Sequence, residues 1–358
     1  MLIGIDASRA FLKKRTGIEE YAYQVIRHLR FQLPEDVCVV LYIRSDQDVT
    51  FDLPKQWRVK KMWAPRLWTQ ARLSLEMFFH RPDILFVPAH TVPIIHPQKT
   101  IVTIHGLEYE FCKEAYSLWE RWYMRLSIWF SCRAAEMVVC VSENTKQDVM
   151  RLYNVAEKKI QVIHEGFEEH GIMNQSGTLS TDIPYFLFIG RLEERKNIVR
   201  VIEAFETLKE RYRIPQKLLL VGKPGYGYER IKKKITESKY QDMIVEKGYV
   251  SEEEKWNLLK NADIFLFPTL YEGFGIPVLE AQSMRIPVVT SKVSSLPEIS
   301  GEGAILVDPG DVESIVEGTH RLFSDQGIRD DIIEKGVDNV HRFGWKRCAR
   351  DLAVFFSQ

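Results

Sequence analysis

Residues 264–280, IFLFPTLYEGFGIPVLE, contain the structural unit from which the fold is built. The four apolar residues 264–267 predict a buried strand, because a short apolar run bounded by turn residues is typical of a strand covered on both faces. A glycine-rich loop follows, and Pro277 suits the first turn of a helix, where its missing N–H would have no partner anyway. The stretch therefore predicts a strand, a loop and a helix in succession, which is the repeating half of a parallel α/β sheet.

The same alternation runs along the whole chain. Strands are predicted at 2–6, 37–43, 84–87, 100–104, 137–141 and 160–163, then at 185–189, 217–221, 243–245, 264–267, 288–290 and 304–307. Helices are predicted at 18–30, 67–79, 115–135, 142–153, 198–212, 252–261, 277–284, 312–323 and 327–342. The polar segment 165–182 separates the two series and predicts a linker. We therefore expect an α/β protein with two doubly wound domains, 1–168 and 183–343, followed by a final helix within 344–358.

Composition excludes several classes of protein. The 358 residues suggest about two domains. Lys and Arg number 49, as do Asp and Glu, so the net charge is zero and a dedicated nucleic-acid binder is disfavoured. No apolar run approaches ~18 residues, so no membrane span is expected, and the N-terminus lacks the pattern of a signal peptide. The five cysteines show no C-x-x-C spacing, which favours reduced thiols in a cytoplasmic protein.

The segments that follow the strands carry the candidate chemistry, because doubly wound sheets bind ligands at the carboxyl ends of their strands. Glu272 lies in the loop after the strand 264–267, and Glu280 lies about one turn inside the helix. Two carboxylates at this spacing could reach different parts of one ligand. The backbone amides between them form a candidate anion site at a helix start; they belong to Gly273, Phe274, Gly275 and Ile276. The alternative is that Glu272 caps the helix and Glu280 is a solvated helix residue, but the G-F-G-x-P frame between them favours a functional site.

A second segment follows the strand 185–189. There Gly190 is succeeded by two cations, Arg191 and Lys196, and then by a helix. Fixed cations beside a helix N-terminus would bind a diphosphate. Ion pairs with the neighbouring glutamates 193 and 194 are an equally good explanation of the same residues. Asn197 is predicted to cap the helix.

Four other segments give weaker indications. His105 directly follows the strand 100–104 and could donate to a sugar hydroxyl, although a lone histidine is more often structural. The loop from residue 6 to Gly17 is either a phosphate loop or an ordinary turn. Tyr249 and Val250 follow the strand 243–245, where backbone amides could bind a nucleobase edge. Residues 46–48, DQD, match the D-x-D pair of metal-dependent sugar transferases, but a solvated turn is favoured and no metal site is predicted.

Taken in order, these motifs resemble those of retaining glycosyltransferases of family 4. The resemblance rests on G-R-L-x4-K-N at 190–197, G-Y-V-S-x-E-E at 248–254, E-G-F-G-I-P-V-L-E-A at 272–281 and S-S-L-P-E-I-S-G at 294–301. Looser matches are R-T-G-I-E-E-Y at 15–21, the His105 segment and V-C-V-S-E-N-T at 139–145. The resemblance implies the GT-B architecture of two facing Rossmann-like domains, with a final helix that crosses back to the N-terminal domain.

The resemblance also implies a role for individual residues of the C-terminal half. Arg191 and Lys196 match the pair that holds the donor diphosphate. Glu280 matches the residue that binds the ribose hydroxyls. Glu272 matches the residue that faces the transferred sugar, and the amides of the glycine-rich loop lie beside it.

In the N-terminal half, His105 matches the histidine that contacts the donor sugar, and Gly17 matches the glycine-rich loop that closes over the phosphates. The chain departs from the family at three places. Gly106 stands where the family often has Asp, Thr16 where it often has Gly, and Arg285 where it usually has Gly. The first departure leaves His105 without its usual carboxylate support.

The expected activity is transfer of a hexosyl group, mannose first, from a GDP- or UDP-sugar to a glycan or lipid-linked acceptor, with no metal and no cofactor. An epimerase or phosphorylase on the same scaffold, or a non-catalytic nucleotide-sugar binding protein, is the alternative. Residues 60–68 and 118–130 mix basic and aromatic residues and predict peripheral contact with the inner face of the plasma membrane. Packing of these aromatic residues against the sheet is the competing explanation.

Overall fold

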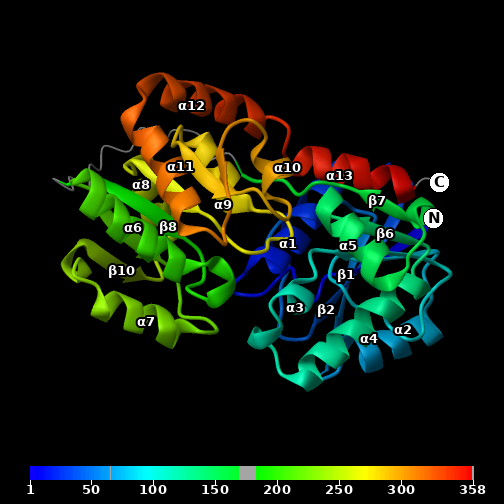
Figure 1. The fold of residues 1–358 in the computed structure, drawn as a ribbon. Helices are drawn as coiled ribbons and strands as arrows, with labels where there is room; N and C mark the ends of the chain where they lie inside the picture. Colours follow the sequence, from blue (N-terminus) through cyan, green and yellow to red (C-terminus); the bar gives the residue numbers. More distant parts are fainter. Residues whose placement is uncertain (65, 169–182, 357–358) are drawn as a thin grey trace. The chain divides into compact units, whose positions relative to one another are not determined.

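The computed structural model describes residues 1–64, 66–168 and 183–356 (Figure 1). The chain forms two compact units. Unit 1 comprises Met1–Glu110, Tyr116–Gly166 and Phe343–Gln358, and unit 2 comprises Phe111–Ala115 and Phe167–Arg342. The C-terminal helix therefore belongs to the same unit as the N-terminus.

Unit 1 is built on a parallel sheet of seven described strands in the order β3-β2-β1-β4-β5-β6-β7. The strands are β1 (Leu2–Asp6), β2 (Cys38–Arg44), β3 (Trp57–Met62), β4 (Ile84–Val87), β5 (Lys99–Ile104), β6 (Met137–Cys140) and β7 (Ile160–Val162). The main helices are α1 (Gly17–Leu29), α2 (Ser74–Phe79), α4 (Leu118–Ala134), α5 (Glu143–Tyr153) and α13 (Trp345–Ala353), and the short helix α3 (Glu108–Phe111) leads into the segment that joins unit 2.

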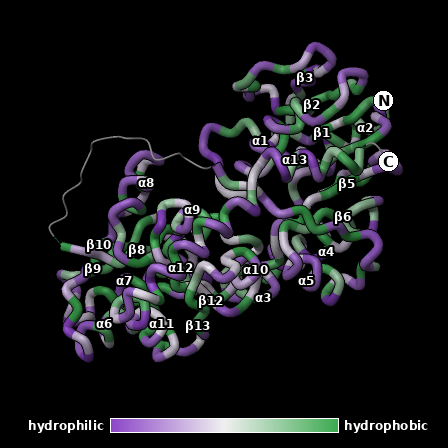
Figure 2. The backbone as a smooth tube through the Cα atoms, turned by 90° about the horizontal axis from the view of Figure 1, so that it is seen from above, coloured by the Kyte–Doolittle hydropathy of each residue, from purple (hydrophilic) through white to green (hydrophobic). Residues whose placement is uncertain are grey.

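Alternate residues of these strands enter two separate cores, because successive side chains point to opposite faces of a sheet. One core contains Ile84 and Phe86 together with apolar residues of α1 and α13. The other contains Leu85 and Val87 together with residues of α2, α4 and α5. Hydrophobic segments accordingly run along central strands such as β5 and β6 (Figure 2). The helices α1 and α13 thus cover one face of the sheet, and α2, α4 and α5 cover the other.

Unit 2 repeats the plan with a parallel sheet of six described strands in the order β10-β9-β8-β11-β12-β13. The strands are β8 (Tyr185–Ile189), β9 (Lys217–Val221), β10 (Ile244–Gly248), β11 (Ile264–Phe267), β12 (Val288–Ser291) and β13 (Ile305–Val307). The helices are α6 (Ile198–Tyr212), α7 (Tyr228–Glu237), α8 (Glu252–Lys260), α9 (Ile276–Ser283), α10 (Leu296–Ser300), α11 (Val312–Ser324) and α12 (Gln326–Val340).

The strand orders place one topological switch point in each unit. In unit 1 the direction of winding changes between β1 and β4, and in unit 2 it changes between β8 and β11. Loops leaving two such neighbouring strands diverge to opposite faces and leave a crevice at the carboxyl edge. Ligand-binding residues are therefore expected after β1 and β4 and after β8 and β11.

Several local expectations were wrong. The strand β3 was not predicted, because its WRVKKM sequence is that of a charged edge strand on which only the two end residues are buried. The helix α7 was missed because it buries only Ile231 and Ile235 in a run of charged residues. Residues 67–79 form a π-helical turn, Trp68–Leu73, followed by α2, rather than one α-helix.

The first residues of the predicted linker were also wrongly assigned. Glu165 and Phe167 are buried, and a Cβ on Gly166 would lie 2.2 Å from the backbone nitrogen of Trp345. Residues 165–167 are therefore packed rather than part of a linker, and 169–182 lie outside the described residues. Arg285 adopts φ +60° directly after α9, where the family usually has glycine, and its side chain forms an ion pair with Glu334. Within the described ranges, no helix is long and apolar enough to cross a membrane.

Candidate active site

At the switch point of unit 2, the segments after β8 and β11 bring Lys196 and Glu272 together. Lys196 Nζ lies 2.6 Å from Glu272 Oε1, although the two residues are 76 positions apart in the sequence. Each residue is only 8% exposed. Arg195 completes the cluster, with Nη1 3.2 Å from Glu272 Oε2 and 2.7 Å from the carbonyl oxygen of Tyr271. The sequence predicted Lys196 and Glu272 as functional residues but gave Arg195 no role.

The cluster is electrostatically balanced around the carboxylate. Burial alone would raise the pKa of Glu272, but the charges of Lys196 and Arg195 outweigh it and hold that pKa below its usual range. Glu272 is therefore an anion whose two oxygens each face a cation. Removing one partner of such a buried pair leaves an uncompensated charge and is strongly destabilising.

The loop that carries Glu272 is fixed by two serines that follow β12. The backbone N–H of Glu272 donates to Ser294 Oγ at 3.0 Å, and its carbonyl oxygen accepts from Ser295 Oγ at 3.0 Å. Gly275 has φ +121°, and a Cβ there would lie 2.8 Å from Leu296, so this position requires glycine. These contacts explain why the motif at 294–301 accompanies E-G-F-G-x-P: it holds that loop at the start of α9.

Arg191 lies at the same edge but is exposed, unlike Lys196. Its aliphatic stem rests against Gly225, where a Cβ would come within 2.7 Å of Arg191 Cδ. The structure shows no hydrogen bond or ion pair from the Arg191 side chain to another described residue. The expected alternative, an ion pair between Arg191 or Lys196 and Glu193 or Glu194, is not formed in the described structure; these glutamates pair with Arg195 and Arg230 instead.

Asn197 occupies the predicted cap position immediately before α6, but its side chain makes no capping hydrogen bond. It adopts the left-handed conformation with φ 63°, and its side-chain nitrogen donates to the carbonyl oxygens of Pro268 at 2.9 Å and Pro309 at 2.7 Å. Asn197 therefore ties together the segments that follow β8, β11 and β13. Gly190 connects β8 to this turn. Gly222 packs directly against the Gly190 backbone, because a Cβ on Gly222 would lie 1.8 Å from the Gly190 carbonyl oxygen.

Glu280 is the fifth residue of α9 and also faces a cation. Lys255 of α8 places Nζ 2.9 Å from Glu280 Oε1 and 2.7 Å from Glu252. Burial would lower the pKa of Lys255, but the two glutamates outweigh burial and raise it. Tyr249 and Val250 follow β10; Tyr249 is 68% exposed and has Lys223 Nζ 4.5 Å from the centre of its ring. Lys255 is a second residue that the sequence analysis missed.

In unit 1, His105 is held by a carboxylate that the sequence did not reveal. Its Nδ1 lies 2.8 Å from Glu165 Oε1, and its Nε2 lies 2.8 Å from the carbonyl oxygen of Pro88. Glu165 and the Pro88 carbonyl both offer acceptor oxygens, so the two contacts fix the orientation of the imidazole ring. The carboxylate support that Gly106 cannot give thus comes from another segment.

The second histidine of this cluster accepts a hydrogen bond from the backbone of the first. The backbone N–H of His105 donates to His90 Nε2 at 3.1 Å, which requires that nitrogen to be unprotonated. Burial, together with the charge of His105 and Arg9, lowers the pKa of His90 well below its usual range. His90 is therefore neutral.

Gly17 and the D-x-D pair lie in open surroundings. Gly17 is the first residue of α1, and a Cβ there would meet no atom within 4 Å. Asp46 and Asp48 are exposed, and Asp48 forms an ion pair with Lys61 at 2.6 Å. Over the described ranges, no group of three or more His, Cys, Asp or Glu side chains is placed to hold a metal ion.

A cavity of about 700 Å³ occupies the switch point of unit 1. Asp6, Ser8 and Arg9 line it from the segment at the end of β1, and His90 lines it from the loop after β4. Arg44 also contributes, and its Nε is buried without a hydrogen-bond partner. Burial raises the pKa of Asp6, although Ser8 and Trp68 donate hydrogen bonds to it. The sequence pointed to this loop only weakly, and gave no signal for Arg44 or His90.

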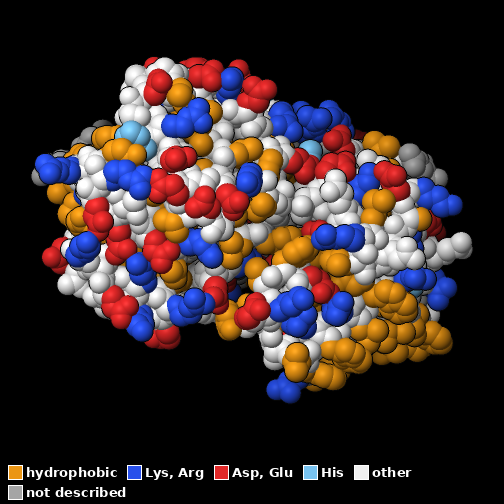
Figure 3. Space-filling model, viewed as in Figure 1, with side chains coloured by type: hydrophobic (Ala, Val, Ile, Leu, Met, Phe, Trp, Pro, Cys, Tyr) orange, Lys and Arg blue, Asp and Glu red, His pale blue; other side chains and the backbone are white. Residues whose placement is uncertain are grey.

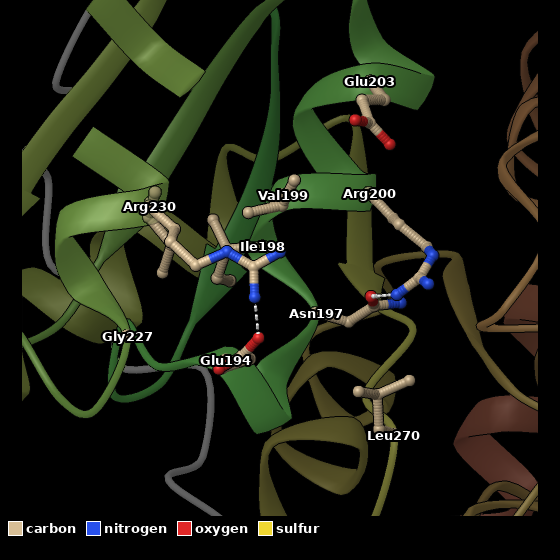
Figure 4. A pocket seen from close by; sticks show the side chains of 10 residues that line it. Glu194, Asn197, Ile198, Val199, Arg200, Glu203, Gly227, Arg230 and Leu270 are labelled. Carbon is tan, nitrogen blue, oxygen red and sulfur yellow. Dashed lines mark hydrogen bonds and ion pairs between the residues drawn. The ribbon is translucent and has the colours of Figure 1, made fainter. Parts of the chain in front are cut away.

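A smaller cavity of about 270 Å³ in unit 2 lies between the starts of α6 and α7 (Figure 4). Glu194 and Arg230 form an ion pair in its wall, and Arg200 donates to Asn197. None of the predicted donor-binding residues lines it. We therefore place the candidate site at the Lys196–Glu272 cluster, where the charges converge, rather than in this cavity.

Two doubly wound parallel sheets of this kind are the plan of the GT-B fold, and solved structures agree. The structure matches sucrose-phosphate synthase from Thermosynechococcus elongatus with a TM-score of 0.79 at 17% identity, covering 100% of this chain and 98% of that one. It matches WaaG, a glycosyltransferase involved in lipopolysaccharide biosynthesis, with a TM-score of 0.72 at 15% identity, covering 99% and 98%.

Family models identify the family. Residues 15–170 match the model described as Glycosyltransferase Family 4, and residues 172–338 match Glycosyl transferases group 1. The chain belongs to glycosyltransferase family 4. It is 28% identical to O-antigen chain mannosyltransferase B of Escherichia coli over 70% of this chain and 68% of that protein. It is also 28% identical to an uncharacterised glycosyltransferase of Methanocaldococcus jannaschii, over 85% and 86%.

Proposed function

We propose that this glycosyltransferase moves a hexosyl group, mannose first, from a nucleotide-diphosphate sugar to a glycan or lipid-linked acceptor, with retention of configuration and without a metal. The observation that carries the proposal is the buried cluster of Lys196, Arg195 and Glu272 at the switch point of unit 2. It places fixed positive charge beside the first turn of α9, whose backbone N–H groups favour an anion.

The residues suit a departing diphosphate. Negative charge grows on the leaving oxygens as the bond between the anomeric carbon and the diphosphate breaks. The Lys196 ammonium has three N–H donors, so its bond to Glu272 leaves two for phosphate oxygens. Arg191, whose guanidinium forms no ion pair with the described residues, would supply the second cation. Preorganised charges of this kind stabilise the transition state without a metal.

The environment of Glu272 favours an orienting role over a nucleophilic one. Both of its carboxylate oxygens face cations, and its pKa is held low, so its basicity and nucleophilicity are reduced. In the reaction we propose, the acceptor oxygen bonds to the anomeric carbon on the face that the diphosphate leaves. The acceptor proton passes to the departing phosphate oxygen. Glu272 then contributes negative charge toward the oxocarbenium-like sugar, and a covalent intermediate on Glu272 is the alternative mechanism.

The rest of the donor would be held by groups around α9. Glu280, oriented by Lys255, would accept hydrogen bonds from ribose hydroxyls. Tyr249 and Val250 would lie at the nucleobase, and His105 and Gly17 keep the donor-binding roles that the family resemblance implies for them. Mannose is supported by the named activities of relatives, O-antigen mannosyltransferases from Escherichia coli and Salmonella typhimurium. Structures of HepE with UDP and UDP-glucose support a nucleotide-sugar donor. They also keep a UDP-sugar as the second candidate donor beside a GDP-sugar.

The biological setting that we propose follows from the same relatives. They act in O-antigen and capsular polysaccharide biosynthesis by name. The polysaccharides in these names favour an acceptor that is a growing glycan or its lipid-linked form. We therefore propose a cytoplasmic enzyme of polysaccharide biosynthesis that contacts the inner face of the plasma membrane peripherally.

A thermal-shift screen against GDP, UDP and their sugars tests the donor assignment. We expect GDP-mannose to raise the melting temperature, because a ligand that binds only the folded state stabilises it by mass action. The Glu280→Ala variant should lose most of this shift, whereas Lys292→Ala, which removes an exposed ion pair of the same unit, should keep it. A shift with no nucleotide or nucleotide sugar, or release of free nucleotide with an epimerised sugar and no transfer, would overturn the proposal.

A further inference from the structure

One helix of unit 1 carries apolar side chains on two faces. Ile128 and Cys132 of α4 are buried in the core against the sheet. The opposite side exposes large apolar side chains at helical spacing: Leu118 (83% exposed), Trp119 (70%), Trp122 (55%), Tyr123 (48%), Leu126 (46%) and Trp129 (42%). The aromatic helix was predicted from the sequence, and packing on the sheet accounts for only one of its faces. The exposed face needs another explanation, because soluble helices normally present polar residues there.

The apolar face extends beyond α4. The helix α2 exposes Leu75, Phe78 and Phe79, and the loop between β4 and β5 exposes Ile94 at 63%. That loop is hydrogen bonded to both helices: the N–H of Ile95 donates to Ser74 Oγ of α2, and the N–H of Val92 donates to Ser131 Oγ of α4. Figure 3 shows hydrophobic side chains gathered over α2 and α4, with lysines and arginines at the margins. We call these residues of α2, α4 and Ile94 the apolar face.

The two segments that carry most of the apolar face have more positive than negative charge, although Arg125 is paired with Glu110. Segments 60–81 and 118–133 hold eight lysines and arginines against two glutamates. Both glutamates are engaged: Glu76 is buried beside Lys60 and Arg72, and Glu120 is bound to Ser117 in a capping box. The first predicted membrane stretch, 60–68, contributes less than expected, because Trp68 is buried and donates to Asp6, and Lys60 and Lys61 are paired with acids. Trp63, Arg66 and Leu67 of that stretch remain exposed.

We propose that the apolar face is a docking surface for a bilayer containing anionic phospholipid. Tryptophan and tyrosine beside arginine suit the boundary between headgroups and acyl chains. The positive margin is complementary to anionic headgroups. The same charge disfavours a symmetric pair of copies, because an isologous interface would set like charges against like charges.

The cavity of unit 1 opens at the edge of the apolar face, which gives the docking surface a function. Leu67 and Tyr123 line the cavity and are 69% and 48% exposed. The cations Arg9 and Arg44 and several hydroxyl groups line the same cavity, and Arg9 is exposed and paired with Glu19. This combination of polar and apolar lining suits an acceptor with a phosphate- and sugar-bearing head and a hydrocarbon tail that stays in the bilayer. The step from docking surface to lipid-linked acceptor rests on the proposed transferase function, whereas docking itself does not.

Co-sedimentation of the full chain with vesicles tests the docking surface without donor or acceptor. The vesicles are phosphatidylcholine alone, or phosphatidylcholine with 30% phosphatidylglycerol (roughly −30 to −50 mV of surface potential), at low and at high salt. We expect binding to anionic vesicles that weakens at high salt. Trp119→Ser/Trp122→Ser should lower the partition coefficient at least about tenfold, since two large apolar side chains no longer enter the interface. Arg81→Gln/Arg133→Gln should lower it by about twenty- to thirtyfold.

The control is Phe31→Ser, which removes an equally exposed aromatic side chain just after α1, on the opposite face of the sheet. It should bind vesicles like the unaltered chain. Light scattering of the same proteins reports any dimer. Absence of binding to anionic vesicles at low salt, equal binding by the tryptophan variant, or a dimer that the tryptophan variant abolishes would each overturn the proposal. Donor binding in the thermal-shift screen is independent of these outcomes, so failure of one proposal is distinguishable from failure of the other.

Discussion

Replacement of Lys196 by alanine should damage both the stability of unit 2 and the reaction. The variant leaves the Glu272 carboxylate buried with Arg195 alone, at 3.2 Å instead of the 2.6 Å of the lost pair. Removing one partner of a buried ion pair costs about 3–5 kcal/mol of unfolding free energy. Because Arg195 remains, we expect about 3 kcal/mol, which is roughly 6–12 °C in melting temperature for a unit of this size. Turnover should fall about a hundredfold or more, because a cation facing the leaving group is lost.

A double-mutant cycle isolates the pair from other effects of the substitution. Lys196→Ala, Glu272→Ala and the double variant are unfolded by heat and by denaturant, and Lys292→Ala provides the control. Lys292 belongs to the same unit and pairs with Asp308 at 3.2 Å, but both side chains are about half exposed, so its loss should change stability by less than about 1 kcal/mol. We expect the double variant to be more stable than the sum of the single changes implies, by about 1–3 kcal/mol.

The pH dependence of the unfolding free energy gives a second test of the pair. The pKa of Glu272 is lowered in the folded state, so its contribution to stability is complete above the unfolded value near 4.5 and is lost as pH falls through the folded value. The stability difference between the unaltered chain and Glu272→Gln should therefore shrink as the pH is lowered from 7 to 3. Additive single changes, with Lys196→Ala no more destabilising than Lys292→Ala, would refute the reasoning.

Three further predictions concern the neighbouring groups. Arg191→Ala should lower turnover about a hundredfold in steady-state kinetics yet leave the melting temperature unchanged, because Arg191 is exposed; near-normal turnover would remove it from the diphosphate site. Glu280→Ala should raise KM and weaken binding of free nucleotide, whereas Glu272→Ala should lower kcat with nucleotide binding retained; calorimetric titration showing the reverse would contradict both assignments. Glu165→Ala should lower kcat about tenfold or more through misplacement of His105, with partial rescue by Glu165→Gln, which can still accept from Nδ1; equal activity of all three proteins would show that the support is not needed.

The fold was predictable because its main signal is local. The central strands are buried on both faces, so strands such as β8 and β11 have continuous apolar sequences that stand out from the amphipathic helices. The edge strand β3 and the charged helix α7 bury too little to leave such a signal. The conformations needed at Gly275 and Pro277 are likewise local, which is why the loop before α9 was correctly placed.

The partners in the site were less predictable because they come from distant segments. Lys196 and Glu272 could be chosen by their positions after strands, but their contact depends on β8 lying beside β11. Glu165 was assigned to a linker because its neighbours are polar, and only its contact with His105 shows its role. Lys255, Ser294 and Ser295 act on Glu280 and the Glu272 loop from other elements of unit 2. Charge and type select candidates along the chain, whereas the sheet order decides which of them meet.

The configuration and metal requirement of the transfer test the central claim most directly. The enzyme is supplied with GDP-α-mannose, an acceptor glycan and excess EDTA, and the new linkage is read from the anomeric proton and carbon signals of the product by NMR. The account predicts an α-linked product, formed at the same rate with EDTA as without it. A β-linked product, or transfer that stops with EDTA and returns with Mn²⁺ or Mg²⁺, would contradict it.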